Sequence, residues 1–365
     1  YYDKQDFEVV RKASNLFSHD VQLLTSQAIK ISDTKDKLSP NSIIIGTLGY
    51  NSLINELISK KKLNISSLKG KWESYHIEVI KYPFPGVEKA LVVVGSDRRG
   101  TAYGLLSISE AIGVSPWYWW ADVPVTKQKE LCIEVKTMTS NEPTVKYRGI
   151  FINDEDWGLL QWAKKNFEKE RGNIGPKTYA KVCELLLRLK ANYLCPAMHE
   201  ASTAFNKIPE NKLVADSFAI IMGSTHCEPL LFNNASEWDK KNMGEWDYVN
   251  NKKTIDSVLK QRVLENSPYE NLYTLALRGL HDQAMKGSDD MSERVKTLGD
   301  ALNAQRQILT DVIKKPANEI PQVFFPYKEV LDVYNAGLHL PDDVTIVWPD
   351  DNYGYMKRLS SPAEQ

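Results

Sequence analysis

The sequence lacks the patterns that mark several common function classes. Its 365 residues carry a formal net charge of −1, whereas proteins that bind nucleic acid usually have a basic excess. No apolar run approaches the roughly 20 residues that span a bilayer. The four cysteines show no C-x-x-C spacing, and the six histidines form no H-x-H or H-x-x-x-H pair. We therefore expect neither a nucleic acid nor a membrane as partner, and neither a metal nor another cofactor. We expect the cysteines to be mainly buried free thiols.

A nucleotide-binding loop is also missing. The turn GSDRRG at residues 95–100 joins an apolar run to a helical pattern, which is where a phosphate could be held. It matches neither G-x-G-x-x-G nor G-x-x-x-x-G-K-[ST], and Asp97 stands where a phosphate would need backbone amides. Aromatic residues, in contrast, are plentiful, with nine Trp, 17 Tyr and 10 Phe. Packing explains them most simply, and binding of sugar rings is the sharper alternative.

Residues 1–140 have the pattern of a small α/β domain. Apolar runs predict strands at 21–31, 42–47, 75–82, 89–95 and 130–138. Helical spacing predicts helices at 51–61 and 101–113. The polar stretch TMTSNEP at 137–143 ends in proline and predicts the domain boundary.

Residues 143–365 alternate short apolar strands with longer helical patterns at 176–190, 252–265 and 292–314. This alternation is typical of a parallel sheet, and we expect a (β/α)8 barrel of the TIM type. The sequence contains about six of the strands, while a complete barrel takes about 250 residues. We expect the barrel to be incomplete in this chain, by about two βα units.

Each predicted barrel strand ends in a polar cluster. The C-terminal ends of barrel strands converge on one face, where active sites are built. A single cluster could be a helix cap, but six clusters rich in acids, His, Trp and Tyr suit a sugar and an acid/base pair. The clusters include NDEDW at 153–157, HE at 199–200, THCE at 225–228, RGLHD at 278–282, YKE at 327–329 and WPDDNY at 348–353.

From about residue 89 onward the chain resembles glycoside hydrolase family 115. The resemblance rests on GSDRRGTAYGLLSISEAIGVSPWYWWADVPV, EPTVKYRGIFINDEDW, GSTHCEP, LRGLHDQAM, FFPYKEV and VTIVWPDDNYGY. It implies an inverting α-glucuronidase that removes glucuronic acid or its 4-O-methyl ether from xylan side branches. It also implies that the aromatic run at 117–120 docks the first domain against the barrel, and that the full-length protein is a homodimer.

The resemblance and the strand ends together predict the site. Asp282 and Glu329 are the candidate catalytic pair, since they end neighbouring strands and inversion needs two carboxyl groups roughly 6.5–9.5 Å apart. Asp350 is a third candidate, as the base or as a residue that orients the water. Arg278 could hold the uronate carboxylate or tune Asp282. The other candidate substrate-binding residues are His226, Tyr327, Asn352 and Asp156.

Two other functions fit part of the pattern. A glycosidase of the hexosaminidase type would need an adjacent Asp-Glu pair, and only Asp154-Glu155, at the first strand, comes close. A non-catalytic carbohydrate-binding protein would need aromatic residues but no opposed acids. We expect glucuronoxylan or its oligosaccharides as the partner and a secreted or periplasmic location, since the chain opens with Tyr1-Tyr2 and looks processed.

Overall fold

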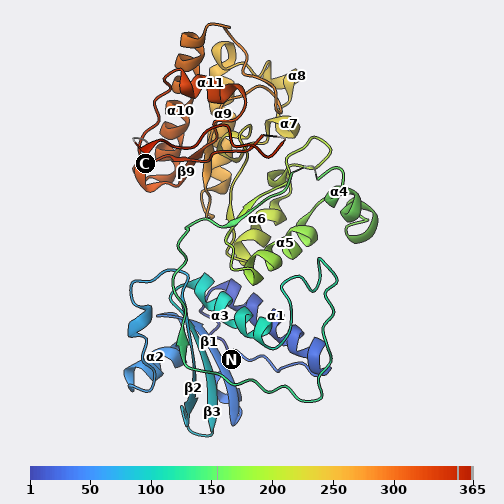
Figure 1. The fold of residues 1–365 in the computed structure, drawn as a ribbon, viewed down its shortest axis with the longest axis vertical. Coiled ribbons are helices and arrows are strands. Elements are labelled where there is room, and N and C mark those ends of the chain that lie inside the picture. Colours follow the sequence, from blue (N-terminus) through green and yellow to red (C-terminus); the bar gives the residue numbers. More distant parts are fainter. Residues whose placement is uncertain (154, 352, 363–365) are drawn as a thin grey trace. The chain divides into compact units, whose positions relative to one another are not determined.

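The computed structural model describes residues 1–153, 155–351 and 353–362 and forms two compact units (Figure 1). The first unit contains Tyr1–Gly149, Ala180–Asn192 and Ser217–Ile220. The second contains Ile150–Tyr179, Tyr193–Asp216 and Ile221–Gln365. Two later segments thus return to the first unit, and the proposed domain border between residues 140 and 143 stays a prediction.

A four-stranded sheet forms the centre of the first unit, in the order β1-β3-β2-β4. Its strands are β1 (Asn41–Thr47), β2 (Tyr75–Lys81), β3 (Lys89–Gly95) and β4 (Met138–Thr139). β1 runs parallel to β3, and β2 runs antiparallel to both β3 and β4. Because side chains alternate along a strand, Ala90, Val92 and Val94 share one face, in a core with α2 (Ser52–Ser59). α3 (Arg98–Ala111) covers the other face together with α1 (Glu8–Thr25) (Figure 1).

Two of the predicted strands are wrong. Residues 21–25 end helix α1, whose buried apolar side chains recur three or four residues apart, at Val10, Ala13, Phe17, Val21 and Leu24. Read alone, the last turn of this helix looks like an apolar strand, and only the longer window shows the helical period. Within the stretch 130–138, only Met138 belongs to a strand, the two-residue β4.

The turn at residues 95–100 is built for close packing and helix capping. Asp97 Oδ1 accepts hydrogen bonds from the backbone N–H of Arg99 (3.0 Å) and Gly100 (2.9 Å), so it is the N-cap of α3. A Cβ atom at Gly100 would lie 2.2 Å from Ser74 O, which leaves room only for glycine. The Asp97 carboxylate therefore binds the backbone N–H groups that a nucleotide-binding loop would offer to phosphate.

The aromatic run that follows α3 contacts the part of α5 (Pro176–Arg188) that belongs to the first unit. Tyr118 Oη donates to Glu184 Oε1 (2.9 Å), and Trp120 Nε1 donates to the carbonyl of Lys181 (3.1 Å). Arg188 lies over the ring of Tyr118 and forms a bidentate ion pair with the fully buried Asp20 of α1. These contacts attach residues 180–188 firmly to the first unit.

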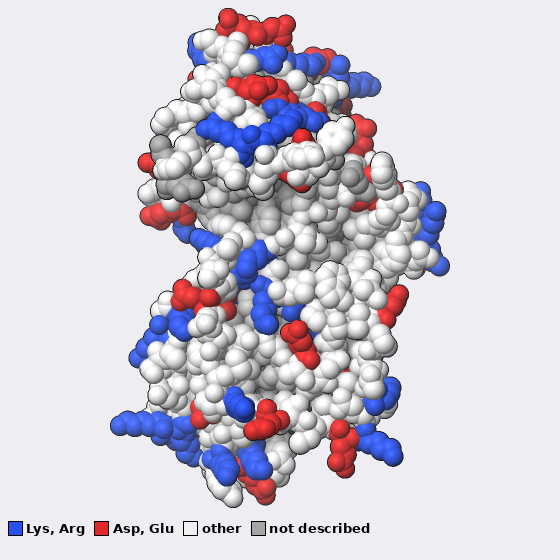
Figure 2. Space-filling view, viewed as in Figure 1, with Lys and Arg blue, Asp and Glu red and all other residues white. Residues whose placement is uncertain are grey.

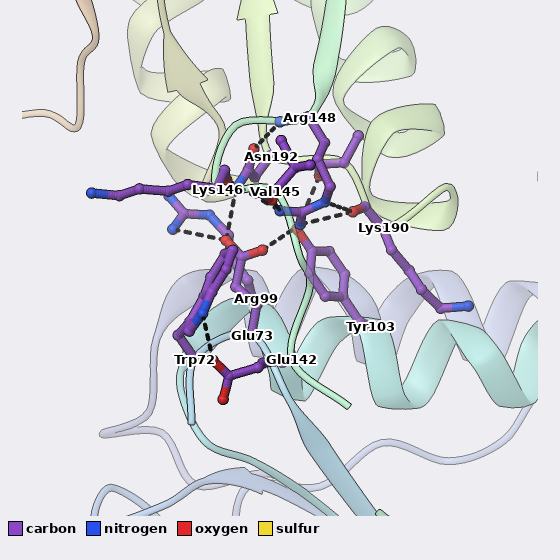
Figure 3. Close-up of polar contacts among 12 residues, drawn as sticks. Trp72, Glu73, Arg99, Tyr103, Glu142, Val145, Lys146, Arg148, Lys190 and Asn192 are labelled. Carbon is purple, nitrogen blue, oxygen red and sulfur yellow. Dashed lines mark hydrogen bonds and ion pairs between the residues drawn. The ribbon is translucent and has the colours of Figure 1, made fainter. Parts of the chain in front are cut away.

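A buried polar cluster ties further segments to the same unit (Figure 3). Glu73 forms ion pairs with Arg148 and Arg99 and accepts a hydrogen bond from Asn192 Nδ2 (2.8 Å). Arg148 also donates to the carbonyl of Lys190, and Tyr103 Oη donates to that of Ala191. A buried charge needs such partners, and two of them, Arg148 and Asn192, lie 75 and 119 positions from Glu73 in the chain.

The second unit contains short strands separated by helices. Its sheets have the orders β5-β6-β7 and β10-β9-β8, and the strand pairs β6–β7, β8–β9 and β9–β10 are parallel. Met222 at the end of β7 forms a parallel bridge with Asn271, just before β8, so neighbours follow one another in chain order. The strands are β5 (Gly149–Phe151), β6 (Tyr193–Cys195), β7 (Ile221–Met222), β8 (Tyr273–Leu275), β9 (Gln322–Phe324) and β10 (Thr345–Ile346).

The three long helices predicted between these strands are confirmed, as α5, α9 (Tyr248–Asn266) and α10 (Met291–Ile313). α9 and α10 pack against each other, and α10 also packs against β8, around a core that includes Leu259, Leu275 and Phe324. Shorter helices complete the unit: α4 (Leu159–Trp162), continued by a π-helical turn (Ala163–Phe167), α6 (Pro209–Ser217), α7 (Asn234–Glu237), α8 (Lys240–Met243) and α11 (Glu329–Asn335).

The described residues also bear on the excluded classes. None of their helices is both long and apolar enough to cross a bilayer. Cys183, Cys195 and Cys227 are buried and free, as predicted, while Cys132 is free and exposed. Acidic and basic side chains are interspersed on the face that Figure 2 shows, in keeping with the near-zero net charge.

Candidate active site

Arg278 lies at the centre of a polar cluster in the second unit. It follows β8, its side chain is 1% exposed, and the Trp246 indole N–H donates to its carbonyl (2.8 Å), which fixes the backbone there. Its Nε and Nη2 donate to the two carboxylate oxygens of Glu329 (2.9 and 2.7 Å). Its Nη1 donates to Asp282 Oδ1, and Nη2 donates also to the Asp282 carbonyl (3.1 Å). One guanidinium therefore joins both candidate catalytic carboxylates.

Asp282 is surrounded by donors. His226 Nε2 lies 2.9 Å from its Oδ1, and the Lys328 ammonium forms an ion pair with its Oδ2. Burial opposes ionisation of the carboxyl, but the hydrogen bonds with His226 and Lys328 and the charge of Arg278 outweigh it. Together they hold the pKa of Asp282 well below its usual range, so this carboxyl is ionised at neutral pH in the sugar-free protein.

Glu329 is placed by the start of helix α11. It is the first residue of this helix, and the preceding Lys328 is its N-cap, with φ 51° and ψ −126°. Such a conformation is costly for a residue with a Cβ atom and persists where surrounding contacts impose it. The two charge-assisted bonds from Arg278 hold the Glu329 carboxylate in one orientation.

His226 lies in a short loop after β7, and hydrogen bonds to the buried Glu228 hold this loop together. Glu228 Oε2 accepts from both the backbone N–H (3.0 Å) and the hydroxyl (2.8 Å) of Thr225, and Ser224 Oγ donates to the Glu228 carbonyl (2.8 Å). Burial raises the pKa of Glu228 to about 7, although the bonds from Thr225 lower it. Glu228 thus sets the shape of the loop that brings His226 to Asp282.

Tyr327 contributes an aromatic surface to the same cluster. Its ring centroid lies 4.5 Å from that of His226, and both Arg278 and Lys328 lie over the ring, at 5.7 and 5.2 Å. Tyr327 and Lys328 also line a pocket together with Asp350. Asp350 forms an isolated antiparallel β-bridge with Met356. The other residues of this pocket are Pro326, Leu331, Trp348, Pro349, Asp351, Tyr353, Lys357 and Arg358.

The structure thus brings together five sequence-predicted residues directly, namely His226, Arg278, Asp282, Tyr327 and Glu329, and places Asp350 on the adjoining pocket. Asp156 instead pairs with His199 Nδ1 (3.1 Å). Asn352 and Asp154 lie outside the described residues.

Known proteins resemble this chain in both sequence and structure. Residues 140–365 match the sequence family Glycosyl hydrolase family 115. A solved family GH115 4-O-methyl-α-glucuronidase, with specificity for decorated arabinogalactans, is 41% identical, with a TM-score of 0.88. The chain belongs to glycoside hydrolase family 115. The match covers 99% of this chain and 46% of that relative, so the chain spans less than half of its length.

More distant structures share only the fold with this family 115 chain. They are a chitobiase from Flavobacterium johnsoniae (10% identity, TM-score 0.51, 97% of this chain and 52% of that one) and a β-N-acetylhexosaminidase from Streptomyces coelicolor A3(2). The second is 10% identical, with a TM-score of 0.50, over 100% of this chain and 67% of its own. No curated protein matches the chain. The likeness to hexosaminidases is therefore one of fold, whereas the family 115 match extends to the sequence.

Sequence reasoning missed the roles of Lys328 and Glu228 in this family 115 site. Lys328 and Glu228 lie inside the quoted motifs, but nothing in their spacing distinguishes an ion-paired lysine or a buried acid from a solvated one. Glu155 is 2% exposed, and its Oε1 accepts from the backbone N–H of His199 (2.7 Å). Its buried Oε2 has no hydrogen-bond partner among the described residues. The sequence singled out Glu155 only as part of the Asp154-Glu155 pair at the first strand end.

Proposed function

We propose that the protein is an inverting α-glucuronidase that releases glucuronic acid, or its 4-O-methyl ether, from the side branches of a plant polysaccharide. The observation that carries this proposal is the single Arg278 guanidinium that bonds to both Asp282 and Glu329. This guanidinium keeps two carboxyl groups together in one site, and two-carboxylate hydrolysis needs such a pair of acids. A binding protein without catalytic activity has no need of this pair.

The two carboxyl groups take different roles in this proposal. Glu329, bonded through both oxygens to Arg278, stays ionised and accepts a proton from the water that attacks the anomeric carbon. Asp282 is the general acid in this proposal: it takes up a proton from water when the substrate binds and passes it to the leaving oxygen as the glycosidic bond breaks. His226 and Tyr327 line the space next to Asp282 and suit the sugar hydroxyls and ring.

The second unit is, in this proposal, part of a (β/α)8 barrel. Six short strands follow one another in chain order, with helices between them. Arg278 and Asp282 follow β8, and Glu329 follows β9, so the cluster lies beyond the carboxyl ends of adjacent parallel strands. This is where barrel enzymes carry their active sites.

Two polymers are candidates for the substrate that carries the uronic acid. The family resemblance suggests glucuronoxylan, while the solved relative is specific for decorated arabinogalactans. Both present a terminal uronic acid to the same pocket. A secreted or periplasmic location belongs to the same proposal, since the substrate is an extracellular polymer. So does a homodimer of the full-length protein, which the family resemblance implies.

The test is release of the uronic acid by the full-length protein, with the product followed by NMR at the anomeric proton. Glucuronoxylan and glucuronidated arabinogalactan oligosaccharides are the substrates. Inversion makes β-glucuronic acid the first product of an α-linked branch, before mutarotation. Asp282→Asn and Glu329→Gln are each expected to lower the rate by about 10²–10⁴-fold. An α-configured first product, or near-normal activity of either variant, contradicts the two-carboxylate assignment.

A further inference from the structure

Arg278 is poorly placed to bind the substrate carboxylate. Its side chain is 1% exposed, and Glu329 occupies its Nε and Nη2 edge. Its Nη1 and again its Nη2 donate to Asp282. A guanidinium has five N–H donors, and at least four of them are committed in this arrangement. The cation that recognises a uronic acid must therefore be sought elsewhere in the cluster.

We propose that Lys328 binds the uronate carboxylate of the substrate and so selects a charged sugar over a neutral one, while Arg278 positions Asp282 and Glu329. This inference rests on the proposed α-glucuronidase function and names the residue that gives it substrate specificity. Lys328 is the residue directly before Glu329, its ammonium pairs with Asp282, and its side chain is 44% exposed. It is thus a cation in contact with the site that solvent, and hence a ligand, can reach.

The backbone and the aromatic neighbour of Lys328 support this role. Its φ of 51° is one that a side chain with a Cβ atom rarely adopts, and such conformations cluster at functional sites. The ammonium also lies 5.2 Å from the centroid of the Tyr327 ring, so its position is held from two sides. Lysine is suited to the task because its ammonium has three rotatable donors on a flexible stem.

Two other cations line the neighbouring pocket, and both are engaged differently. Arg358 lies over the rings of Tyr334 and Trp348, at 4.8 and 5.4 Å, and donates to the Asn335 side chain. Lys357 lies 3.8 Å from Asp351. Lys328, in contrast, forms an ion pair with the candidate catalytic carboxylate of Asp282.

Binding through Lys328 would also shift Asp282 toward its protonated form, with the proton taken up from water. In the sugar-free protein, the ammonium is one of three groups that keep this carboxyl ionised. A uronate that takes the ammonium removes one of these partners and brings a second negative charge near Asp282. Both changes favour the protonated form that a general acid needs. A neutral sugar would leave the ammonium on Asp282.

The experiment compares binding of D-glucuronate with that of its neutral amide, D-glucuronamide, to the full-length protein by titration calorimetry. The wild-type protein is expected to prefer glucuronate. Lys328→Met should weaken glucuronate binding about ten- to a hundredfold, because a hydrogen bond to a charged group is lost, and leave glucuronamide binding nearly unchanged. Lys328→Arg retains the charge and should keep part of the preference.

Lys286→Met is the matched control, because the Lys286 side chain is also 44% exposed and pairs with a carboxylate, that of Glu245, outside the cluster. It should bind both sugars as the wild-type protein does. An unchanged preference for glucuronate in Lys328→Met overturns the role assigned to Lys328 and leaves the proposed α-glucuronidase function untouched. An equal loss of glucuronate binding and glucuronamide binding in that variant also overturns the role of Lys328 in selecting the charge, since its role is then structural. A wild-type protein that binds neither sugar and releases no uronic acid overturns the proposed function itself.

Discussion

At the scale of single residues, the fork between Arg278 and Glu329 is expected to matter more than charge alone. Arg278→Lys keeps the charge but cannot form the two parallel bonds to Glu329. We expect kcat for uronic acid release to fall by about 100-fold or more, since a general base must be held in place. Arg306→Lys is the control, because Arg306 forms a similar fork with Asp343 (2.9 and 3.0 Å) outside the cluster. A near-normal kcat in Arg278→Lys would contradict this role.

Glu228 makes stability depend on pH. Its folded-state pKa of about 7 lies above the ordinary value of 4.5, mainly because of burial, so the folded state holds a proton more tightly than the unfolded state. The contribution to stability is fully present below about pH 4.5 and is lost as the pH rises through about 7. It amounts to at most about 3.5 kcal/mol, since one pKa unit corresponds to about 1.4 kcal/mol.

Glu228→Gln should therefore unfold with a weaker pH dependence than the wild-type protein between pH 4.5 and 7. The measurement is the free energy of unfolding in denaturant at several pH values. Glu210→Gln, at an exposed position of α6, serves as the control and should follow the wild-type curve. Parallel curves for Glu228→Gln and the wild-type protein would show that Glu228 is ionised in the folded state across this range.

At the scale of elements, helix α3 depends on its first turn. Asp97 accepts two backbone hydrogen bonds there, and loss of such a cap typically costs about 1 kcal/mol. Asp97→Ala should speed hydrogen exchange of the amides in α3 about fivefold, while Asp290→Ala, at the exposed cap of α10, should affect only α10. Unchanged exchange in α3 would mean that packing against β3 alone holds the helix.

At the scale of the whole molecule, recognition of the uronic acid and of the polymer should be separable. Lys328, Arg278 and Asp282 form one cluster within the second unit, and the proposal assigns them to the terminal sugar and its glycosidic bond. Lys328→Met should therefore lower kcat/KM by the same factor on glucuronoxylan and on arabinogalactan branches. A loss confined to one polymer would place Lys328 in contact with the polymer backbone instead.

The sequence by itself determined much of this protein. The alternation of short apolar runs with helical patterns predicted α5, α9 and α10, since the periodicity of a long helix is a local property. The motifs around Arg278, Asp282 and Glu329 predicted which side chains would meet, because residues that follow adjacent parallel strands share one edge of a sheet. Local pattern failed at residues 21–25, where the last turn of α1 resembles a strand until the whole helix is considered.

Only the tertiary structure decided what each charged group does. Arg278 looked available for a uronate until its donors were seen to be committed to Asp282 and Glu329. Lys328 and Glu228 looked ordinary until one was found paired with Asp282 and the other buried under Thr225. The physical reason is that hydrogen-bond partners and burial set the ionisation and availability of a charged side chain, and residues such as Asp282 and Lys328 lie 46 positions apart in the chain. The sequence thus shows which charged groups are present, and the three-dimensional contacts determine how they ionise and what they can bind.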